Sequence, residues 1–141
     1  MSALIDVNVL VALMHARDRH SRNAVTWVEE ATEPGAIAIC RVVQMGTLRI
    51  LTSSAIMRED TLTATEFWGG WDRVVADDRF GQVAEPSTLD PVWRSLTSGL
   101  PRGSAGTDAY LAAFAIAGTH RLTTFDQGFR RFPELDLEVL A

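Results

Sequence analysis

Short apolar runs that alternate with longer helical segments constrain the fold of this chain more than any other feature. The runs rich in β-favouring residues occupy residues 3–5, 36–39, 82–84, 121–125 and 137–140. They are too short and too continuously apolar to be the alternating strands of an open antiparallel sheet. Segments with helical periodicity fill the gaps, at residues 9–16, 20–32, 41–51, 63–76, 89–97 and 107–117. This alternation predicts an α/β fold with a mainly parallel sheet and right-handed crossovers.

The length and cysteine content indicate one domain in a reducing compartment. The chain has 141 residues, of which 47% are hydrophobic, which is enough to bury roughly two-thirds of the unfolded surface. We find no repeat, low-complexity tract or long linker, and we expect a single domain over residues 1–141. The single cysteine, Cys40, lies among apolar residues and has no partner for a disulfide or a thiolate metal site. We expect it to be buried.

The N-terminus and the charge narrow the classes of function. Residues 1–18 have no basic leader, and Asp6 and Asn8 interrupt the apolar run, so we expect neither a signal peptide nor a membrane span. We therefore expect a cytoplasmic protein. The net charge of -5 argues against a nonspecific nucleic-acid coat, but a polyanionic substrate stays open because local fields depend on where charges cluster. All thirteen basic residues are arginine, which suits phosphate pairing or reflects codon bias.

Two helical segments carry unusual apolar patterns. The segment 107–117 is apolar nearly all round, which predicts a buried helix that ends at Gly118 in a left-handed cap. The segment 63–76 carries a single apolar stripe, which either packs in the core or forms a protein interface. The stripe consists of Phe67, Trp68, Trp71, Val74 and Val75.

Three aspartates lie where predicted elements begin or end. Asp6 closes the first strand, Asp108 opens the buried helix, and Asp126 follows the fourth strand. In a parallel sheet, sites gather outside the carboxyl ends of the strands. If the first and fourth strands are neighbours, all three carboxylates reach one cleft.

The same aspartates also have purely structural explanations. Asp6 or Asn8 can cap the following helix, Asp108 can favour the helix dipole from the first turn, and Asp126 can begin an Asx turn. Taken together, however, several like charges in one cleft repel unless a proton or cation is held there. Carboxylates without cysteines or paired histidines suggest a hard cation such as Mg²⁺ or Mn²⁺, whose usual use is phosphoryl chemistry. The scattered histidines, His15, His20 and His120, are interpreted as surface or helix-end residues.

Three stretches of the sequence form a pattern by their order and spacing: "LIDVNVLVAL" at residues 4–13, "CRVVQMGTLRILT" at 40–52 and "TDAYLAAFAIAGTHRLTTFDQGFRRFPEL" at 107–135. In these stretches the sequence resembles the PIN-domain ribonucleases, and among them the VapC-type toxins of bacterial toxin–antitoxin pairs. The resemblance covers essentially the whole chain. The resemblance implies a three-layer α/β/α sandwich around a five-stranded parallel sheet. It also implies endonucleolytic cleavage of RNA, a homodimer and inhibition by a cognate antitoxin.

The resemblance also implies a site. Asp6, Asp108 and Asp126 match the family's metal-binding acids for Mg²⁺ or Mn²⁺, while Asn8 and Thr124 match supporting polar groups. The family's other acid falls at Gln44, where this chain has an amide. Some of these toxins have a similar Gln-(Leu/Met)-Gly helix.

The amide at Gln44 leaves more than one interpretation open. It can face the site, where its carbonyl oxygen meets a metal-bound water and the lost charge weakens metal binding. It can also merely bond to the neighbouring backbone. The leading hypothesis is a metal-dependent RNase toxin, and the alternative is a degenerate PIN domain that binds RNA or protein. A phosphatase of the haloacid-dehalogenase type is disfavoured because it needs an acid where Asn8 stands and a lysine that this chain lacks.

Overall fold

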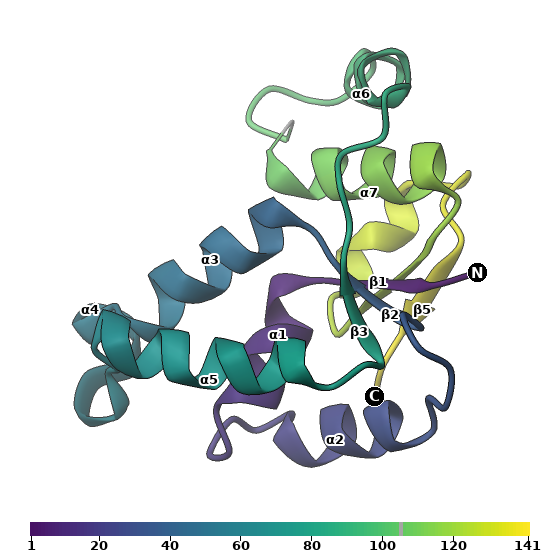
Figure 1. Cartoon of the computed structure of the whole chain (residues 1–141). Helices are drawn as coiled ribbons and strands as arrows, with labels where there is room; N and C mark the ends of the chain where they lie inside the picture. The colour runs from purple at the N-terminus through teal and green to yellow at the C-terminus, as the bar shows by residue number, and fades with distance from the viewer. Residues whose placement is uncertain (105) are drawn as a thin grey trace.

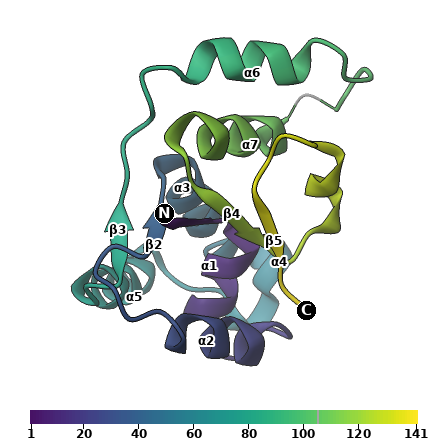
Figure 2. The same ribbon diagram turned by 90° about the vertical axis from the view of Figure 1, so that its right-hand side faces the viewer.

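The computed structural model describes residues 1–104 and 106–141. The sheet of the described chain has five strands, all parallel, in the order β3-β2-β1-β4-β5. The strands are β1 (Ala3–Ile5), β2 (Ile37–Ile39), β3 (Phe80–Gln82), β4 (Arg121–Thr124) and β5 (Leu137–Val139). β1 lies at the centre between β2 and β4 (Figure 2). The predicted parallel α/β fold is confirmed. The first and fourth strands are neighbours, which was the condition for the three carboxylates to reach one cleft.

Helices cover both faces of this sheet in three layers (Figure 1). The helices are α1 (Val7–Met14), α2 (Ser21–Glu29), α3 (Arg41–Leu51), α4 (Ser54–Met57), α5 (Ala64–Ala76), α6 (Leu89–Thr97) and α7 (Thr107–Gly118), with 3-10 turns η1 (Arg58–Asp60) and η2 (Gln127–Arg131). On one side of the sheet, α7 packs on β4 and α6 covers α7. On the other side lie α1, α2 and α5. α3 packs on α1 and α5, and α4 and η1 connect α3 to α5.

Most predicted boundaries agree within about two residues, and the clearest differences concern the third strand and the first two helices. The third strand was expected at residues 82–84 but lies at Phe80–Gln82, because pairing with β2 begins when the N–H of Ile37 donates to the carbonyl of Arg79. The first helix begins two residues early, at Val7, because Asp6 caps it. The second helix ends at Glu29, three residues early. The short turns α4, η1 and η2 were not predicted, since a single turn leaves no periodicity to detect.

The predicted central helix is confirmed, but its termination differs. α7 buries Ala109 and residues 111–115. The left-handed residue is Thr119, with φ of 57°, and not Gly118, which is the last residue of the helix. Gly118 is needed for a different reason, because a Cβ there would lie 2.8 Å from the ring of His120.

The apolar stripe on α5 divides between core and surface. Phe67 and Trp71 are buried, which confirms a core role for them, whereas Trp68 and Val75 are 42% and 37% exposed. A capping box between Thr63 and Glu66 fixes the start of this helix. Cys40 is buried as expected, and burial raises the pKa of its thiol. None of the described helices combines the length and apolarity needed to cross a bilayer.

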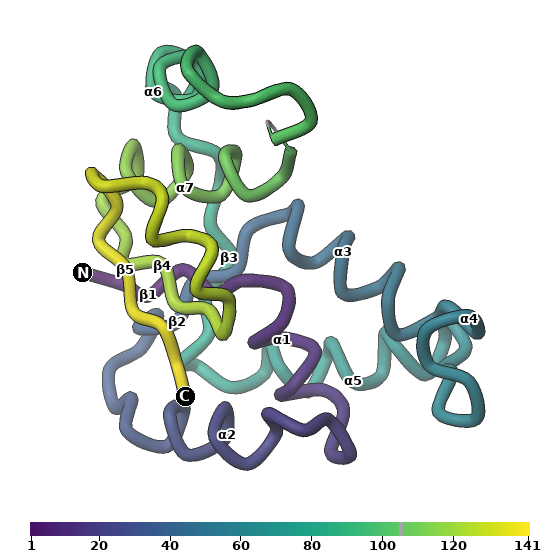
Figure 3. The backbone as a smooth tube through the Cα atoms, turned by 180° about the vertical axis from the view of Figure 1, so that it is seen from behind, coloured from purple at the N-terminus to yellow at the C-terminus, as the bar shows by residue number. Residues whose placement is uncertain are grey.

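The topology brings the carboxyl ends of β1 and β4 to one edge of the sheet. The residues that follow these two strands, Asp6 and Asp126, therefore begin α1 and η2 next to each other. η2 and the chain leading to β5 lie on the α7 side of the sheet (Figure 3). The N-terminus of α7, with Asp108, faces the same region.

Candidate active site

Asp6 is the most firmly held acid of the site. It follows β1 directly, and its Oδ1 accepts a hydrogen bond of 2.7 Å from the backbone N–H of Val7. Its Oδ2 accepts a second hydrogen bond, also of 2.7 Å, from the hydroxyl of Thr124. Asp6 is only 8% exposed. Two donors on a buried carboxylate fix its orientation.

Three effects act on the protonation of Asp6. Burial raises the pKa of the Asp6 carboxyl above its ordinary value of 3.8. The hydrogen bonds from Thr124 and Val7 lower this pKa in part, and the negative charges of Asp108 and Asp126 raise it further. The two other acids are therefore close enough to be felt electrostatically at Asp6. Such a group of acids is stabilised by any proton or cation that enters it.

Thr124 connects the acids of β1 and β4. Its hydroxyl donates to Asp6 and accepts the backbone N–H of Asp126 at 3.0 Å and the amide of Asn8 at 3.2 Å. The carbonyl oxygen of the Asn8 side chain accepts the N–H of Phe125 at 3.2 Å. Asn8 and Thr124 therefore tie the first turn of α1 to the end of β4. Asn8 and Thr124 are uncharged, and their role is to position Asp6 and Asp126.

Asp126 is exposed and begins η2 as its N-cap. Its Oδ1 accepts the backbone N–H of Gly128 at 2.7 Å, which makes this segment an Asx turn as well as a candidate site. A Cβ at Gly128 would lie 3.0 Å from Oδ1 of Asp126 and 3.3 Å from Nη1 of Arg131. Only a residue without a side chain fits comfortably between these two groups.

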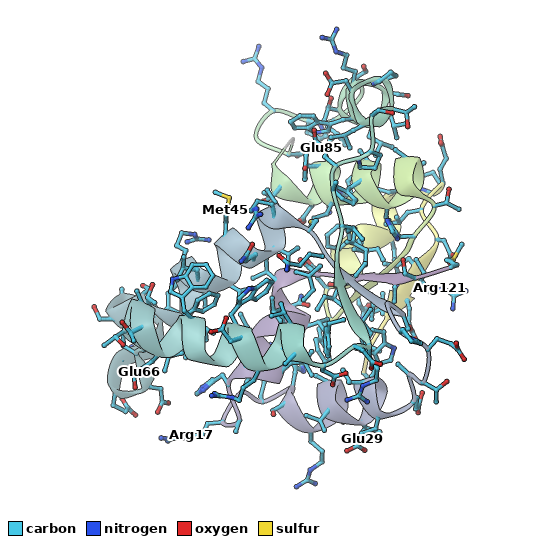
Figure 4. All side chains as sticks on the ribbon, in the orientation of Figure 1. Arg17, Glu29, Met45, Glu66, Glu85 and Arg121 are labelled. Carbon is cyan, nitrogen blue, oxygen red and sulfur yellow. The ribbon has the colours of Figure 1, made fainter. Side chains whose placement is uncertain are left out.

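Asp108 lies in the first turn of α7 and is partly exposed. Its Oδ2 lies 3.4 Å from Nη2 of Arg131. Asp6 and Asp108 both line a cavity of about 650 Å³ between α3 and the start of α7. The α3 side of this cavity consists of Val42, Met45, Gly46, Leu48, Arg49 and Ile50. Met45 projects from α3 into solvent at its rim (Figure 4).

Gln44 lies close to the cavity side of α3. It precedes Leu48, a cavity residue, by one helical turn and so shares a side of the helix with it. It is buried, and its Oε1 accepts a hydrogen bond from Nη1 of Arg41. Among the described residues, Gln44 does not line the cavity that Asp6 and Asp108 share. Its assignment to the site stays a prediction.

The three acids fit a hard divalent cation by chemistry, although they do not form a closed ligand cage. Asp6 and Asp126 form no ion pair within the described ranges, so a cation would not have to displace a basic side chain from either of them. Carboxylate oxygens are the donors that Mg²⁺ and Mn²⁺ prefer. As the side chains stand, no three acidic, histidine or cysteine groups among residues 1–104 and 106–141 are grouped as metal ligands. A cation would have to draw Asp108 and Asp126 toward Asp6.

The histidines lie at helix ends, as expected. His15 is the C-cap of α1 and lies 3.9 Å from Asp60. His20 precedes α2 and stacks on Phe125. His120 follows α7 and bonds to Ser2.

The sequence did not single out Arg131 or Arg41, which contact Asp108 and Gln44 respectively. It indicated only that the basic residues are all arginine, which suits phosphate pairing. Neither contact has a sequence signature, since the Arg131 contact joins η2 to α7 and the Arg41 contact depends on the rotamer of a long side chain.

Comparisons with known proteins agree on one family. The sequence model for "PIN domain" matches residues 3–135. The chain is 34% identical over 143 aligned residues to Ribonuclease VapC41 of Mycobacterium tuberculosis, covering 98% of each chain. Both comparisons span all the candidate acids.

Solved structures share the fold. VapBC2 from Rickettsia felis, bound to a DNA fragment from its promoter, superposes with a TM-score of 0.69 at 19% identity over 100% of both chains. A toxin–antitoxin complex from Klebsiella pneumoniae superposes with a TM-score of 0.63 at 21% identity, covering 95% of each chain. At these identities the likeness concerns the fold.

Proposed function

Because the chain belongs to the PIN-domain family, we propose that it is the ribonuclease toxin of a toxin–antitoxin pair, hydrolysing RNA internally with Mg²⁺ or Mn²⁺. The observation that carries this proposal is the buried carboxyl of Asp6, whose pKa is raised by burial and further by Asp108 and Asp126. An aspartate that merely capped α1 would not need two further acids within electrostatic reach. The relative named Ribonuclease VapC41 supports the RNA substrate.

Asp6, Asp108 and Asp126 would hold the metal ion. When bound, such an ion polarises the phosphodiester and makes a water molecule more acidic. Asp6 is the fixed anchor, because the N–H of Val7 and the hydroxyl of Thr124 hold both its oxygens. The two more exposed acids adjust to it.

The supporting residues act on orientation and on the approach of RNA. Thr124 and Asn8 hold the Asp126 turn against α1, so the acids of β1 and β4 keep their spacing. Arg49 in the cavity wall and Arg131 beside Asp108 offer positive charge to the RNA backbone near an otherwise acidic centre.

The partners follow from the family and from the exposed surfaces. VapBC2 and the Klebsiella complex are toxin–antitoxin assemblies, which supports a cognate antitoxin for this chain. A basic antitoxin segment would place an arginine on the acids and cover the exposed part of the α5 stripe, Trp68 and Val75. We further propose that the toxin is a homodimer and acts in the cytoplasm.

The direct test is cleavage of RNA by the purified protein with Mg²⁺ or Mn²⁺. Asp6→Ala and Asp126→Ala should each abolish cleavage. Asp72→Ala, which removes an exposed acid from α5, is the matched control and should cleave as wild type does. Full activity in Asp6→Ala or Asp126→Ala would refute the assignment. The antitoxin proposal fails if the protein is harmless when expressed alone and does not co-purify with the product of an adjacent reading frame.

A degenerate PIN domain that binds RNA or protein without cleaving is the second candidate, and Gln44 favours it. An amide stands where the family has an acid, and Arg41 occupies its carbonyl oxygen. Calorimetry separates the two candidates. Binding of Mn²⁺ by wild type supports the enzyme, whereas binding gained only in Gln44→Glu supports the module.

A further inference from the structure

Arg131 is held beside the acidic centre by three contacts of its own. Its Nη2 lies 3.4 Å from Oδ2 of Asp108, and its Nη1 donates to the backbone carbonyl of Gly128 at 2.7 Å. Its guanidinium also stacks on Phe132, with Cζ 4.6 Å from the ring centroid. Phe132 is buried in the core, so this stacking holds the Arg131 guanidinium against a fixed part of the structure.

Arg131 is the basic side chain that forms an ion pair with one of the three acids among the described residues. Asp108 would otherwise add its whole charge to the field around Asp6, which already responds to it. A single positive charge at this position offsets part of the repulsion that the acids exert on one another.

The ion pair between Arg131 and Asp108 can be broken at little cost in stability. The side chains of Arg131 and Asp108 are 39% and 40% exposed, and half-exposed pairs of this kind contribute little to stability. A divalent cation on Asp108 brings twice the charge and repels the guanidinium. The divalent cation and the Arg131 guanidinium therefore compete for the Asp108 carboxylate. The guanidinium carries the smaller charge, and it can move away from Asp108 into solvent.

We propose that Arg131 is an exchangeable counter-ion of the site, paired with Asp108 while the metal is absent and with a phosphate of the RNA once the metal holds Asp108. This inference rests on the proposed function. The contacts to Gly128 and Phe132 keep the released guanidinium at the rim of the acidic centre, where the RNA backbone must pass. The planar guanidinium pairs with phosphate oxygens as it does with a carboxylate.

The first test measures Mn²⁺ binding by calorimetry without RNA. Arg131→Gln should lower the Kd for Mn²⁺ roughly three- to tenfold, because the competing charge is gone. Arg130→Gln removes the same charge from the neighbouring residue, which is exposed, and should change the Kd less than roughly twofold. Equal effects in the two variants, or weaker binding in Arg131→Gln, would overturn the proposal.

Arg131→Lys separates charge from shape and covers the case of a misfolded glutamine variant. Lysine keeps the competing charge, so its Kd for Mn²⁺ should stay near that of wild type. A Kd lowered as much as in Arg131→Gln would show that charge is not the reason and would overturn the proposal. Melting curves by circular dichroism verify that each variant is folded.

The second test measures whether Arg131 pairs with a phosphate of the RNA. The slope of log KM against log salt concentration for a single-stranded RNA should shrink by about 0.7 in Arg131→Gln, as expected for one lost phosphate contact. The Arg130→Gln slope serves as the reference, and an Arg131→Gln slope equal to it refutes the transfer. Failure of the proposed function looks different, because wild type itself would then bind no Mn²⁺ and leave RNA intact.

Discussion

Replacing Thr124 with valine would remove one hydroxyl from the centre of the site while preserving the side-chain volume. That hydroxyl donates to Asp6 at 2.7 Å and accepts the N–H of Asp126 at 3.0 Å and the amide of Asn8 at 3.2 Å. Thr124 is fully buried, so water cannot easily replace the lost partner. The variant therefore leaves a buried carboxylate with one donor fewer.

The expected loss of stability is about 3 kcal/mol. A hydrogen bond to a charged group is worth about 2 kcal/mol, and stranding the backbone N–H of Asp126 costs about 1 kcal/mol more. For a chain of this length, 1 kcal/mol corresponds to about 3 °C in melting temperature, so Thr124→Val should melt roughly 9 °C lower. Because the Thr124 hydrogen bond lowers the pKa of Asp6, its loss should also move the acid limb of the activity profile to higher pH.

Thr123 supplies a matched control on the same strand. It is fully buried as well, but its hydroxyl has no hydrogen-bond partner among the residues that the structure describes. Valine there replaces an unsatisfied polar group with a methyl group, so Thr123→Val should be more stable by about 1 kcal/mol. Both substitutions replace a threonine hydroxyl with a methyl group, but Thr124→Val should lower the free energy of unfolding and Thr123→Val should raise it.

The assay is urea and thermal unfolding of both variants beside wild type, followed by circular dichroism, with RNA cleavage measured against pH. If Thr124→Val is as stable as wild type, or if both variants shift stability in the same direction, the hydrogen-bond network described around Asp6 is wrong. A loss of stability in Thr124→Val without a shifted acid limb would mean that Asp6 does not control the pH dependence of cleavage.

Three further substitutions test other parts of the structure. Asp6→Asn removes a buried charge, but its amide nitrogen donates where a carboxylate oxygen accepted a hydrogen bond, so the variant should lose Mn²⁺ binding. The folded-state pKa of Asp6 lies above 3.8, so wild type gains stability as the pH falls through that raised value, and melts at successive pH values should show wild type gaining stability relative to Asp6→Asn. Thr119→Gly relieves a β-branched residue at φ of 57° and should raise the free energy of unfolding by about 1 kcal/mol in urea titrations. Gly46→Ala places a Cβ 2.9 Å from a methyl group of Val7, and it should cost about 1 kcal/mol and weaken Mn²⁺ binding in calorimetry, although alanine favours helices.

The chain order of strands and helices predicted much of the fold, because periodicity and parallel topology are read directly from local pattern. Asp6 and Asp126 follow apolar runs that become neighbouring strands, so their proximity followed from topology alone. The third strand was misplaced because it is an edge strand whose position is set by its pairing with Ile37, and pairing is not a local property. The left-handed cap was assigned to Gly118 on propensity, whereas Gly118 is the last helical residue and the left-handed turn falls at Thr119.

The sequence by itself determined the fold class and the family and singled out the three aspartates as candidates, because each of these depends on residue type and order. Only the tertiary structure decided how these acids are held and neutralised. Thr124 supports Asp6 across 118 positions of sequence, and Arg131 reaches Asp108 from a different element. Gln44 turned out to face Arg41 on its own helix. The contacts of Thr124 and Arg131 depend on distances of a few ångströms between separate elements, and such distances are fixed only when the whole core packs.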